Sequence, residues 1–391
     1  MSRRLSRKHL LRWAGATGGG LALGAAGYAK LEGGSASADS QVEQFHGVHQ
    51  AGITNPQPKY LQFASLDVQV AGKSGLRDVM RALTTAAADL TAGNAPPTGT
   101  SFDPALLTIT FGFGASLFDS RFGLASQRPP ALVDMPHFKG DQLRPELSDG
   151  DIGVQCCAAS REVVERAQAA LVAVTDGATS VRWSQYGLVR DALPGEKGGT
   201  PRNIVGFKDG TNNLHGDDAA KMRSNVWVGA TDGPAWMTNG SYLVTRNLTV
   251  HVSNFLTEPL SVQEYAFGRR KSSGAPFGQK HEFDPVIVSK EPTDCHIMMA
   301  NPRKPGSEAE RILRRGYTFT TGYDSQISSP LGGLFFIAYQ RDPRRQFIPI
   351  QSRLAVHDRF TVEYPVPRGS AMYAVPPGIR RGGYVGETML A

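Results

Sequence analysis

The two halves of the chain repeat one order of apolar segments, and this order restricts the fold more than any other feature. In the first half, alternating apolar residues predict strands, and apolar residues at three- or four-residue spacing predict helices. The predicted segments are strand 61–70, helix 74–90, strands 106–113 and 151–158, helix 161–174 and strand 179–186. Ser74 and Ser160 are the expected N-caps of the two helices. The order β-α-β-β-α-β is typical of a ferredoxin-like domain.

The second half of the 391-residue chain repeats this order more loosely. Its predicted segments are strand 241–252, helix 262–267, strand 334–339, helix 347–355 and strand 371–375. We therefore predict an α+β protein of two ferredoxin-like domains, in which antiparallel sheets carry helices on one face. The predicted domains are 45–200 and 201–391. The irregular stretch 127–150 is predicted to be a functional or dimer-forming excursion.

Positive charge is concentrated at the start of the chain. The whole sequence has 42 Lys and Arg against 35 Asp and Glu, but residues 1–38 hold six of the basic residues and one acidic residue. The remaining chain has 36 basic and 34 acidic residues, a net charge of +2. A nearly neutral body gives no electrostatic reason to expect nucleic acid as a partner.

Residues 1–38 have the pattern of an export signal. Arg3 and Arg4 form a twin-arginine pair, a glycine-rich apolar stretch follows over 13–29, and Ala-Ser-Ala at 36–38 provides a small-x-small cleavage site. The apolar stretch is short for a membrane span. We predict export by the twin-arginine machinery to the periplasm, the cell envelope or the medium. A basic tail without signal function is the alternative.

Three cysteines are too few for a disulfide framework, so all three are predicted to be small buried hydrophobic residues. Cys156 and Cys157 are neighbours in a predicted strand and should face opposite sides of it. The same alternation applies to Arg314 and Arg315, which lead into an extended segment. One of these arginines should point inward, where it needs an anionic partner, and the other outward.

Two residues are candidates for chemistry, and each has a plainer interpretation. Asp209 lies in the segment 206–211, Gly-Phe-Lys-Asp-Gly-Thr, and Asp-Gly is also a common turn dipeptide. A calcium loop that starts at Asp209 is excluded, because its sixth and twelfth positions are Leu214 and Ala220 rather than Gly and Glu. His296 lies in an apolar segment, where a hydrogen-bonded core histidine is more common than a metal ligand. The residues alone leave these alternatives open.

Several motifs, in their order along the chain, together resemble the dye-decolourising peroxidase family. These motifs are His-Gln-Ala-Gly-Ile at 49–53, Gly-Ala-Ser-Leu-Phe-Asp at 114–119, Gly-Phe-Lys-Asp-Gly-Thr at 206–211, Gly-Arg-Arg-Lys at 268–271, His296 with Ala-Asn-Pro-Arg at 300–303, and Leu-Arg-Arg-Gly-Tyr at 313–317. The chain is similar to the exported bacterial branch described as deferrochelatase/peroxidase and linked to iron uptake. The resemblance implies two ferredoxin-like domains, with haem b held mainly by the C-terminal one.

The resemblance also assigns roles to single residues. It implies that His296 is the proximal ligand of the haem iron, that Asp209 is the distal acid–base residue and that Arg314 is the distal arginine. Further haem contacts are implied for Gly210, Thr211, Asn212, Asn301, Pro302, Arg303 and Arg314. An acidic residue should orient His296. Glu363 is the first candidate for this residue, and Asp358 is the second.

These assignments imply an enzyme that reduces hydrogen peroxide and oxidises dyes, phenols or porphyrin-type molecules through an oxo-ferryl intermediate. One alternative is a deferrochelatase, which releases iron from haem and leaves the porphyrin intact. The other is a non-enzymatic haem carrier, which needs His296 but neither Asp209 nor Arg314. Family analogy also implies a homo-oligomer, a reducing small-molecule substrate and an iron-uptake complex as partners.

Overall fold

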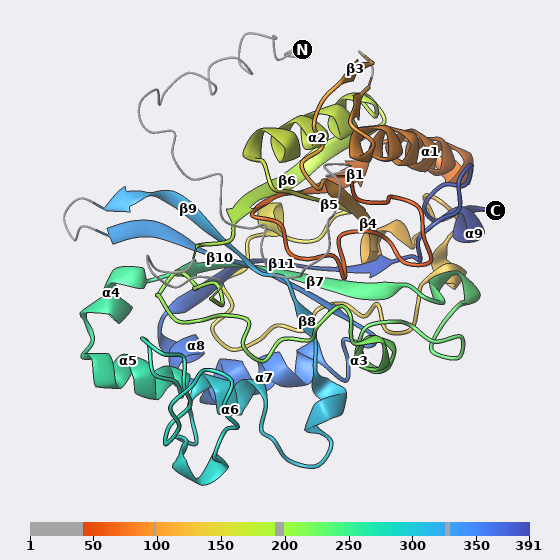
Figure 1. The fold of residues 1–391 in the computed structure, drawn as a ribbon. Helices are drawn as coiled ribbons and strands as arrows, with labels where there is room; N and C mark the ends of the chain where they lie inside the picture. The colour runs from red at the N-terminus through yellow and green to blue at the C-terminus, as the bar shows by residue number, and fades with distance from the viewer. Residues whose placement is uncertain (1–41, 97–98, 192–198, 325–328) are drawn as a thin grey trace, which may run out of the picture. The chain divides into compact units, whose positions relative to one another are not determined.

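The first half of the chain has the strand and helix order predicted for it. The computed structural model describes residues 42–391 except 97–98, 192–198 and 325–328, so the predicted signal at 1–38 lies outside the described residues (Figure 1). The elements are β1 (Tyr60–Val68), α1 (Gly72–Thr91), the short β2 (Asn94–Ala95) and β3 (Thr100–Ser101), β4 (Thr108–Gly114), β5 (Ile152–Ala158), α2 (Arg161–Ala173) and β6 (Thr179–Leu188). Four antiparallel strands form a sheet in the order β4-β5-β1-β6, and α1 and α2 cover one of its faces.

The two helices of this half form because each has one apolar stripe. In α1, Leu76 and Leu83 lie two helical turns apart, and both are fully buried. The predicted N-cap Ser74 is wrong, because α1 begins two residues earlier at Gly72, whose φ of 75° turns the chain without a side-chain cap. Ser160 does precede α2, but its side chain makes no capping hydrogen bond.

The second half repeats this order and adds further helices. Its elements are α3 (Ala219–Asn225), β7 (Ser241–Val250), α4 (Val252–Thr257), α5 (Leu260–Phe267), α6 (His296–Ala300), β8 (Leu313–Arg314), β9 (Tyr317–Asp324), β10 (Ser329–Gln340), α7 (Phe347–His357), α8 (Arg359–Glu363), β11 (Pro365–Val375) and α9 (Glu387–Leu390). The antiparallel order β9-β10-β7-β11 is the same permutation as in the first half, so the predicted ferredoxin-like pattern is confirmed twice. The sequence pattern did not predict β9, because threonine and glycine interrupt its apolar residues.

The two sheets join at their edges. β4 pairs with β11 at Gly114 and Tyr373, and β6 pairs with β9 at Leu188 and Thr318. Together with the β7–β10 pairing, these contacts close eight strands into a ring. Each half therefore covers the edge strands of the other, which would otherwise expose unpaired main-chain groups. The predicted domain boundary after residue 200 stays a prediction.

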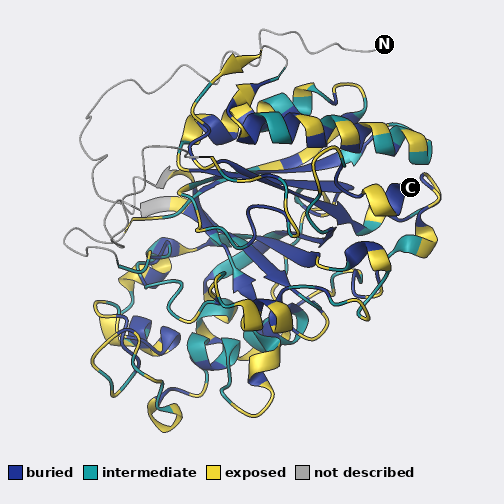
Figure 2. Ribbon diagram, turned by 45° about the vertical axis from the view of Figure 1, so that its right-hand side comes forward, coloured by how far each residue is buried: buried dark blue, intermediate teal, exposed yellow. Residues whose placement is uncertain are grey.

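An aromatic layer fills the space between the two sheets. Phe63 of β1 stacks on Trp183 of β6 with ring centres 5.2 Å apart, and it packs against Phe335 of β10 at 5.4 Å. Cys157 belongs to this layer, whereas Cys156 packs with residues of α1 and α2, so the predicted opposite orientation is confirmed. Figure 2 shows the strands as the most buried elements. No helix in the described parts of the chain is long and apolar enough to cross a bilayer.

The irregular stretch 127–150 crosses from the first half to the second. The amide of Gln142 donates to the carbonyl of Pro367 in β11 at 3.1 Å. The Asp141 carboxylate forms an ion pair with Arg246 of β7, and both side chains are almost fully buried. The stretch therefore fastens the two halves within one chain, and its predicted part in dimer formation stays a prediction.

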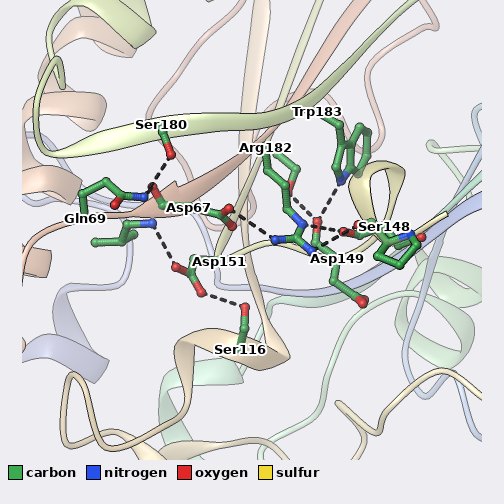
Figure 3. A network of polar contacts seen from close by, with 12 residues as sticks. Asp67, Gln69, Ser116, Ser148, Asp149, Asp151, Ser180, Arg182 and Trp183 are labelled. Atoms are coloured by element: carbon green, nitrogen blue, oxygen red, sulfur yellow. Dashed lines mark hydrogen bonds and ion pairs between the residues drawn. The ribbon is translucent and has the colours of Figure 1, made fainter. Parts of the chain in front are cut away.

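A polar network attaches the end of this stretch to the first sheet (Figure 3). Trp183 Nε1 donates to the carbonyl of Asp149 at 2.9 Å, and Arg182 Nε donates to the carbonyl of Ser148 at 2.7 Å. Arg182 also forms an ion pair with Asp67 of β1 at 3.3 Å. These contacts tie β1 and β6 to the segment that leads into β5.

Asp151 is the most buried carboxylate of this network. It is 2% exposed and accepts hydrogen bonds from the Val68 amide at 2.9 Å, Ser116 Oγ at 2.7 Å and Arg121 Nη2 at 2.8 Å. Burial alone would raise the pKa of Asp151, but the hydrogen bonds, that from Arg121 first, outweigh burial and lower the pKa below its usual value. The ionised carboxylate is thus part of the folded structure.

Replacing Asp151 by asparagine is expected to lower the free energy of unfolding by about 1–3 kcal/mol at about pH 7. Because the pKa is depressed on folding, the carboxylate stabilises the fold above the pKa of the unfolded chain, about 3.9. That contribution is lost as pH falls through the lower pKa of the folded state. The difference in stability between wild type and Asp151→Asn should therefore shrink on acidification. Denaturant titrations from about pH 7 to about pH 3 measure this difference.

Asp191→Asn is the matched control for this prediction. Asp191 forms an exposed ion pair with Lys59, for which a cost of about 0–1 kcal/mol is expected. The prediction would be contradicted if Asp191→Asn lowered the free energy of unfolding as much as Asp151→Asn does. A difference between wild type and Asp151→Asn that grows at low pH would contradict it as well.

Candidate active site

Asp209 lies in a loop whose shape depends on two glycines. Gly206 and Gly210 have φ angles of 89° and 136°, which residues with a side chain rarely adopt. The Asp209 amide donates to the carbonyl of Pro201 at 2.8 Å, which fixes the main chain at this point. Oδ1 of Asp209 lies 2.6 Å from Nη1 of Arg314, so the two side chains form an ion pair.

Arg314 is held by a side-chain amide from the same loop. It lies on β8 and pairs with Ala338 of β10. The Arg314 amide donates to Oδ1 of Asn213 at 2.9 Å, and Nδ2 of Asn213 donates to the Arg314 carbonyl at 2.7 Å. Asn213 thus bonds to Arg314 as a neighbouring strand would, and it connects the arginine to the loop of Asp209.

Arg315 is the inward-pointing arginine of the pair, but among the described residues it bonds to the carbonyls of Ile53 and Asn55 and not to the expected anionic partner. It is 4% exposed, and Nη1 donates to the carbonyl of Asn55 at 2.6 Å. The alternation along the strand holds, but both sides of β8 are covered. Arg314 faces a cavity beside the second sheet, and Arg315 faces the interior next to Cys157 and Tyr339.

His296 is the first residue of α6 and is held by a buried acid. Its Nδ1 lies 2.8 Å from Oδ2 of Asp358, whose side chain is fully buried. Asp358 also caps α8 by accepting hydrogen bonds from the amides of Phe360 and Thr361. Burial alone would lower the pKa of His296, but the charge and hydrogen bond of Asp358 outweigh burial and raise the pKa. With Nδ1 engaged, Nε2 is the ring nitrogen available to a ligand.

Two of the predicted contact residues are not part of this arrangement. Glu363, the first candidate for the acid beside His296, is exposed at the end of α8. Asp358 takes that position because it is the N-cap of α8, and five residues of helix turn Glu363 to another side. Pro302 is not among the described residues that line the cavity below, although its neighbours Asn301 and Arg303 are.

One cavity brings the remaining predicted residues together. His296, Asp209 and Arg314 all line it. The other predicted residues that line it are Gly210, Thr211, Asn212, Asn301 and Arg303. Its apolar walls include Phe207, Leu248, Phe267, Leu334, Phe336 and Phe360. Segments far apart in the sequence therefore surround one pocket on the outer side of β7 and β10.

The cavity fits an iron porphyrin with carboxylate side chains. Its walls are mainly apolar, and the imidazole of His296 is a common axial ligand of haem iron. Arg246, Arg269 and Arg303 also line the cavity and can bind carboxylates. The Nε atom of Arg246 is buried and has no hydrogen-bond partner among the described residues, so it is a donor left over for a ligand.

Arg246 is a charged residue of this cavity that the sequence analysis did not identify. It lies in the middle of β7, a strand whose first six residues are all buried, and it is 1% exposed. A charged residue inside an otherwise apolar strand was a detectable signal, because such a charge needs a buried partner. That partner, Asp141, lies 105 residues away in the irregular stretch, and no local pattern connects the two.

Comparisons with known proteins agree with this geometry. The family model described as "Dyp-type peroxidase, N-terminal" matches residues 50–189, and the model described as "Dyp-type peroxidase, C-terminal" matches residues 200–380. A protein named Deferrochelatase from Shigella flexneri serotype 5b (strain 8401) is 35% identical over 410 aligned positions, which cover 98% of this chain and 97% of that protein. A Deferrochelatase from Escherichia coli (strain K12) is 36% identical over 379 positions, 91% of this chain and 89% of that protein.

Solved structures give the same result. The oxyferrous complex of DtpA from Streptomyces lividans superposes with a TM-score of 0.83 at 33% identity, over 90% of this chain and 98% of that chain. A DyP-type peroxidase from Streptomyces coelicolor superposes with a TM-score of 0.82 at 33% identity, over 90% of this chain and 97% of that chain. The predicted resemblance is confirmed, and with it haem b as the cofactor and a haem-dependent peroxidase as the class of enzyme. This chain belongs to the Dyp-type peroxidase family.

Proposed function

We propose that this enzyme reduces hydrogen peroxide at the Asp209–Arg314 pair, with His296 as the axial ligand of haem iron. The observation that carries the proposal is the meeting of two pairs at one apolar cavity. Asp209 and Arg314 form an ion pair at 2.6 Å, and His296 bonds to buried Asp358 at 2.8 Å. Haem supplies the redox-active iron at which the peroxide bond is broken and electrons from a reducing substrate are taken up.

The proximal pair prepares a basic ligand. Asp358 accepts the Nδ1 proton of His296 in its hydrogen bond, which fixes the tautomer and directs the Nε2 lone pair to the cavity. The two main-chain amides that donate to Asp358 keep its carboxylate in place. A partly anionic imidazole is a stronger donor to a metal than an isolated one.

The distal pair moves the proton. Asp209 accepts a proton from one oxygen of hydrogen peroxide and returns it to the other oxygen, so that the departing oxygen leaves as water. Arg314 forms an ion pair with Asp209 and stabilises negative charge that develops on the departing oxygen. Asn213 fixes the main chain of Arg314 through two hydrogen bonds.

A deferrochelatase activity is a second candidate, supported by the name of the Shigella and Escherichia relatives. Such an activity needs the same cavity and the same histidine, but it removes iron and leaves the porphyrin intact. Dyes, phenols or porphyrins are the reducing substrates that we propose for the peroxidase activity. A plain haem carrier is less well supported, because binding alone gives no reason for a carboxylate–guanidinium pair at the cavity.

We also propose export by the twin-arginine route, a homo-oligomeric state and a place in an iron-uptake complex. The arginine pair at 3–4, the apolar stretch 13–29 and the cleavage site at 36–38 support export.

When Arg3 and Arg4 are both replaced by lysine, the enzyme should accumulate in the cytoplasm. Equal export of wild type and double variant, measured by cell fractionation, would contradict this proposal.

Purified wild-type protein should show a strong Soret band. Replacing His296 by alanine should remove this band. The cause is the loss of the axial ligand, so imidazole added to the buffer should restore part of the band. Absorption spectra of both proteins, normalised to protein concentration, measure the effect. His137→Ala, in an exposed part of the stretch 127–150, is the control and should keep the spectrum of wild type. An unchanged spectrum in His296→Ala would refute the ligand assignment.

Replacing Asp209 by asparagine should slow the reaction with hydrogen peroxide by about 10²–10⁴-fold, because proton transfer is lost. Arg314→Leu should slow it by about 10²–10³-fold, because charge stabilisation is lost. Both variants should keep their haem. Stopped-flow absorbance at several peroxide concentrations gives the second-order rate constants.

Asp232→Asn is the matched control for these two variants. Asp232 pairs with Arg341 at 2.6 Å and has similar exposure, but it does not line the cavity. Wild-type rates in Asp209→Asn and Arg314→Leu would overturn the proposed mechanism.

The same proteins also serve to test the deferrochelatase candidate. After incubation of haem-loaded protein with an iron chelator, fluorescence of iron-free porphyrin is measured. If wild type gives no such fluorescence, the deferrochelatase candidate is removed.

A further inference from the structure

Glu282 is a buried carboxylate outside the cavity that binds three side chains at once. It lies between α5 and α6 and is 8% exposed. Its Oε1 accepts hydrogen bonds from the hydroxyl groups of Thr200 and Thr211, the latter at 2.9 Å. Its Oε2 lies 2.8 Å from Nζ of Lys208, whose side chain is 11% exposed. All three donors lie in residues 200–211, the segment that contains Asp209.

The three donors surround Asp209 in the chain. Lys208 directly precedes it, and Thr211 follows two residues later. Thr200 lies next to Pro201, whose carbonyl accepts the amide proton of Asp209. One carboxylate therefore holds the loop before and after Asp209 and also holds the segment on which the loop rests.

Glu282 is itself fixed in place. Its carbonyl accepts a hydrogen bond from Nη1 of Arg269 at 2.9 Å, and the same atom of Arg269 donates to the carbonyl of Gly274 at 2.6 Å. A Cβ atom at Gly274 would lie 2.8 Å from Cδ of Lys208 and 3.1 Å from Cγ of Glu282. Because the packing is this close, the Lys208–Glu282 pair has little room to move.

The charge of Glu282 also matters for the loop. Burial alone would raise the pKa of Glu282, but hydrogen bonds from Lys208, Thr200 and Thr211 outweigh burial and hold the pKa below its usual value. Glu282 is therefore a carboxylate at neutral pH and compensates charge on Lys208, which lines the cavity one residue from Asp209. Without it, the ammonium group would be less restrained beside the proposed proton acceptor.

We propose that Glu282 is a positioning residue for the peroxide step: it holds the loop so that Asp209 meets Arg314 in the cavity. This inference depends on the proposed function of Asp209. Glu282 is absent from the described residues that line the cavity, so it acts through Lys208, Thr200 and Thr211. A displacement of about 1 Å in a catalytic group can cost a factor of about 10² in rate.

The test compares haem-loaded wild type with Glu282→Ala, Glu282→Gln and Thr200→Val. Glu282→Ala should slow the second-order reaction with hydrogen peroxide by about 10–10²-fold, with haem content and KM for the reducing dye unchanged. Glu282→Gln keeps an oxygen that can accept from the two threonines, so it should slow the reaction less than Glu282→Ala does. Thr200→Val removes one contact and should slow the reaction several-fold. Glu165→Gln, which removes an exposed pair with Arg161 in α2, is the control and should behave as wild type.

Hydrogen–deuterium exchange gives a second measurement that does not depend on activity. Amides of 203–213 should exchange at least about tenfold faster in Glu282→Ala than in wild type, because the loop has lost its anchor. Amides of β1 should exchange at the wild-type rate. If Glu282→Ala does not fold, the same measurements on Glu282→Gln and Thr200→Val decide the question.

The results separate failure of this inference from failure of the proposed function. If Asp209→Asn reacts with peroxide as fast as wild type, the proposed function of Asp209 is wrong. If Asp209→Asn is slow but every Glu282 and Thr200 variant reacts at the wild-type rate, the positioning role is overturned. Slow reaction together with wild-type exchange in 203–213 would also overturn it, since the loop would not have moved.

Discussion

Closure of eight strands into one ring is the constraint on which the rest of the structure depends. Each half alone would be a four-stranded sheet with two unpaired edges. The pairings β4–β11 and β6–β9 remove these edges and enclose an aromatic layer around Phe63 between the sheets. The inner faces of both sheets are therefore buried against each other. The outer face of the first sheet is covered by helices, and the outer face of the second sheet carries helices and the cavity.

The cavity lies between the outer face of β7 and β10 and the segments that cover this face. The β8 strand, the loop of Asp209 and the helices α6 and α8 each bring one functional group to the space in between. Each group is held by a contact that crosses chain segments: Asn213 holds Arg314, and Asp358 holds His296. The active site is therefore an assembly of several short segments on a rigid sheet, an arrangement that keeps reacting groups within a small tolerance.

The fold was predictable because strand and helix periods are local, and the residues of the site were predictable because the motifs around Asp209 and His296 are distinctive. The acid beside His296 was not predictable with the same certainty. Glu363 and Asp358 are both acidic and lie five residues apart, and only the start of α8 decides that Asp358 is the cap. Arg246 was missed for a different reason, since its partner Asp141 comes from an irregular stretch with no periodic pattern.

The charges around the cavity connect cofactor binding with folding. Burial lowers the pKa of Arg269 and of Arg303, which means that their charged forms are poorly solvated. Arg269 donates to the carbonyls of Gly274 and Glu282, and Arg303 donates to those of Ile297 and Asn301. Carbonyl groups satisfy these donors but carry no full negative charge. A porphyrin with two carboxylates supplies that charge, so its binding should stabilise the folded state. This coupling agrees with the proposed twin-arginine route, which transports proteins after they have folded around their cofactor.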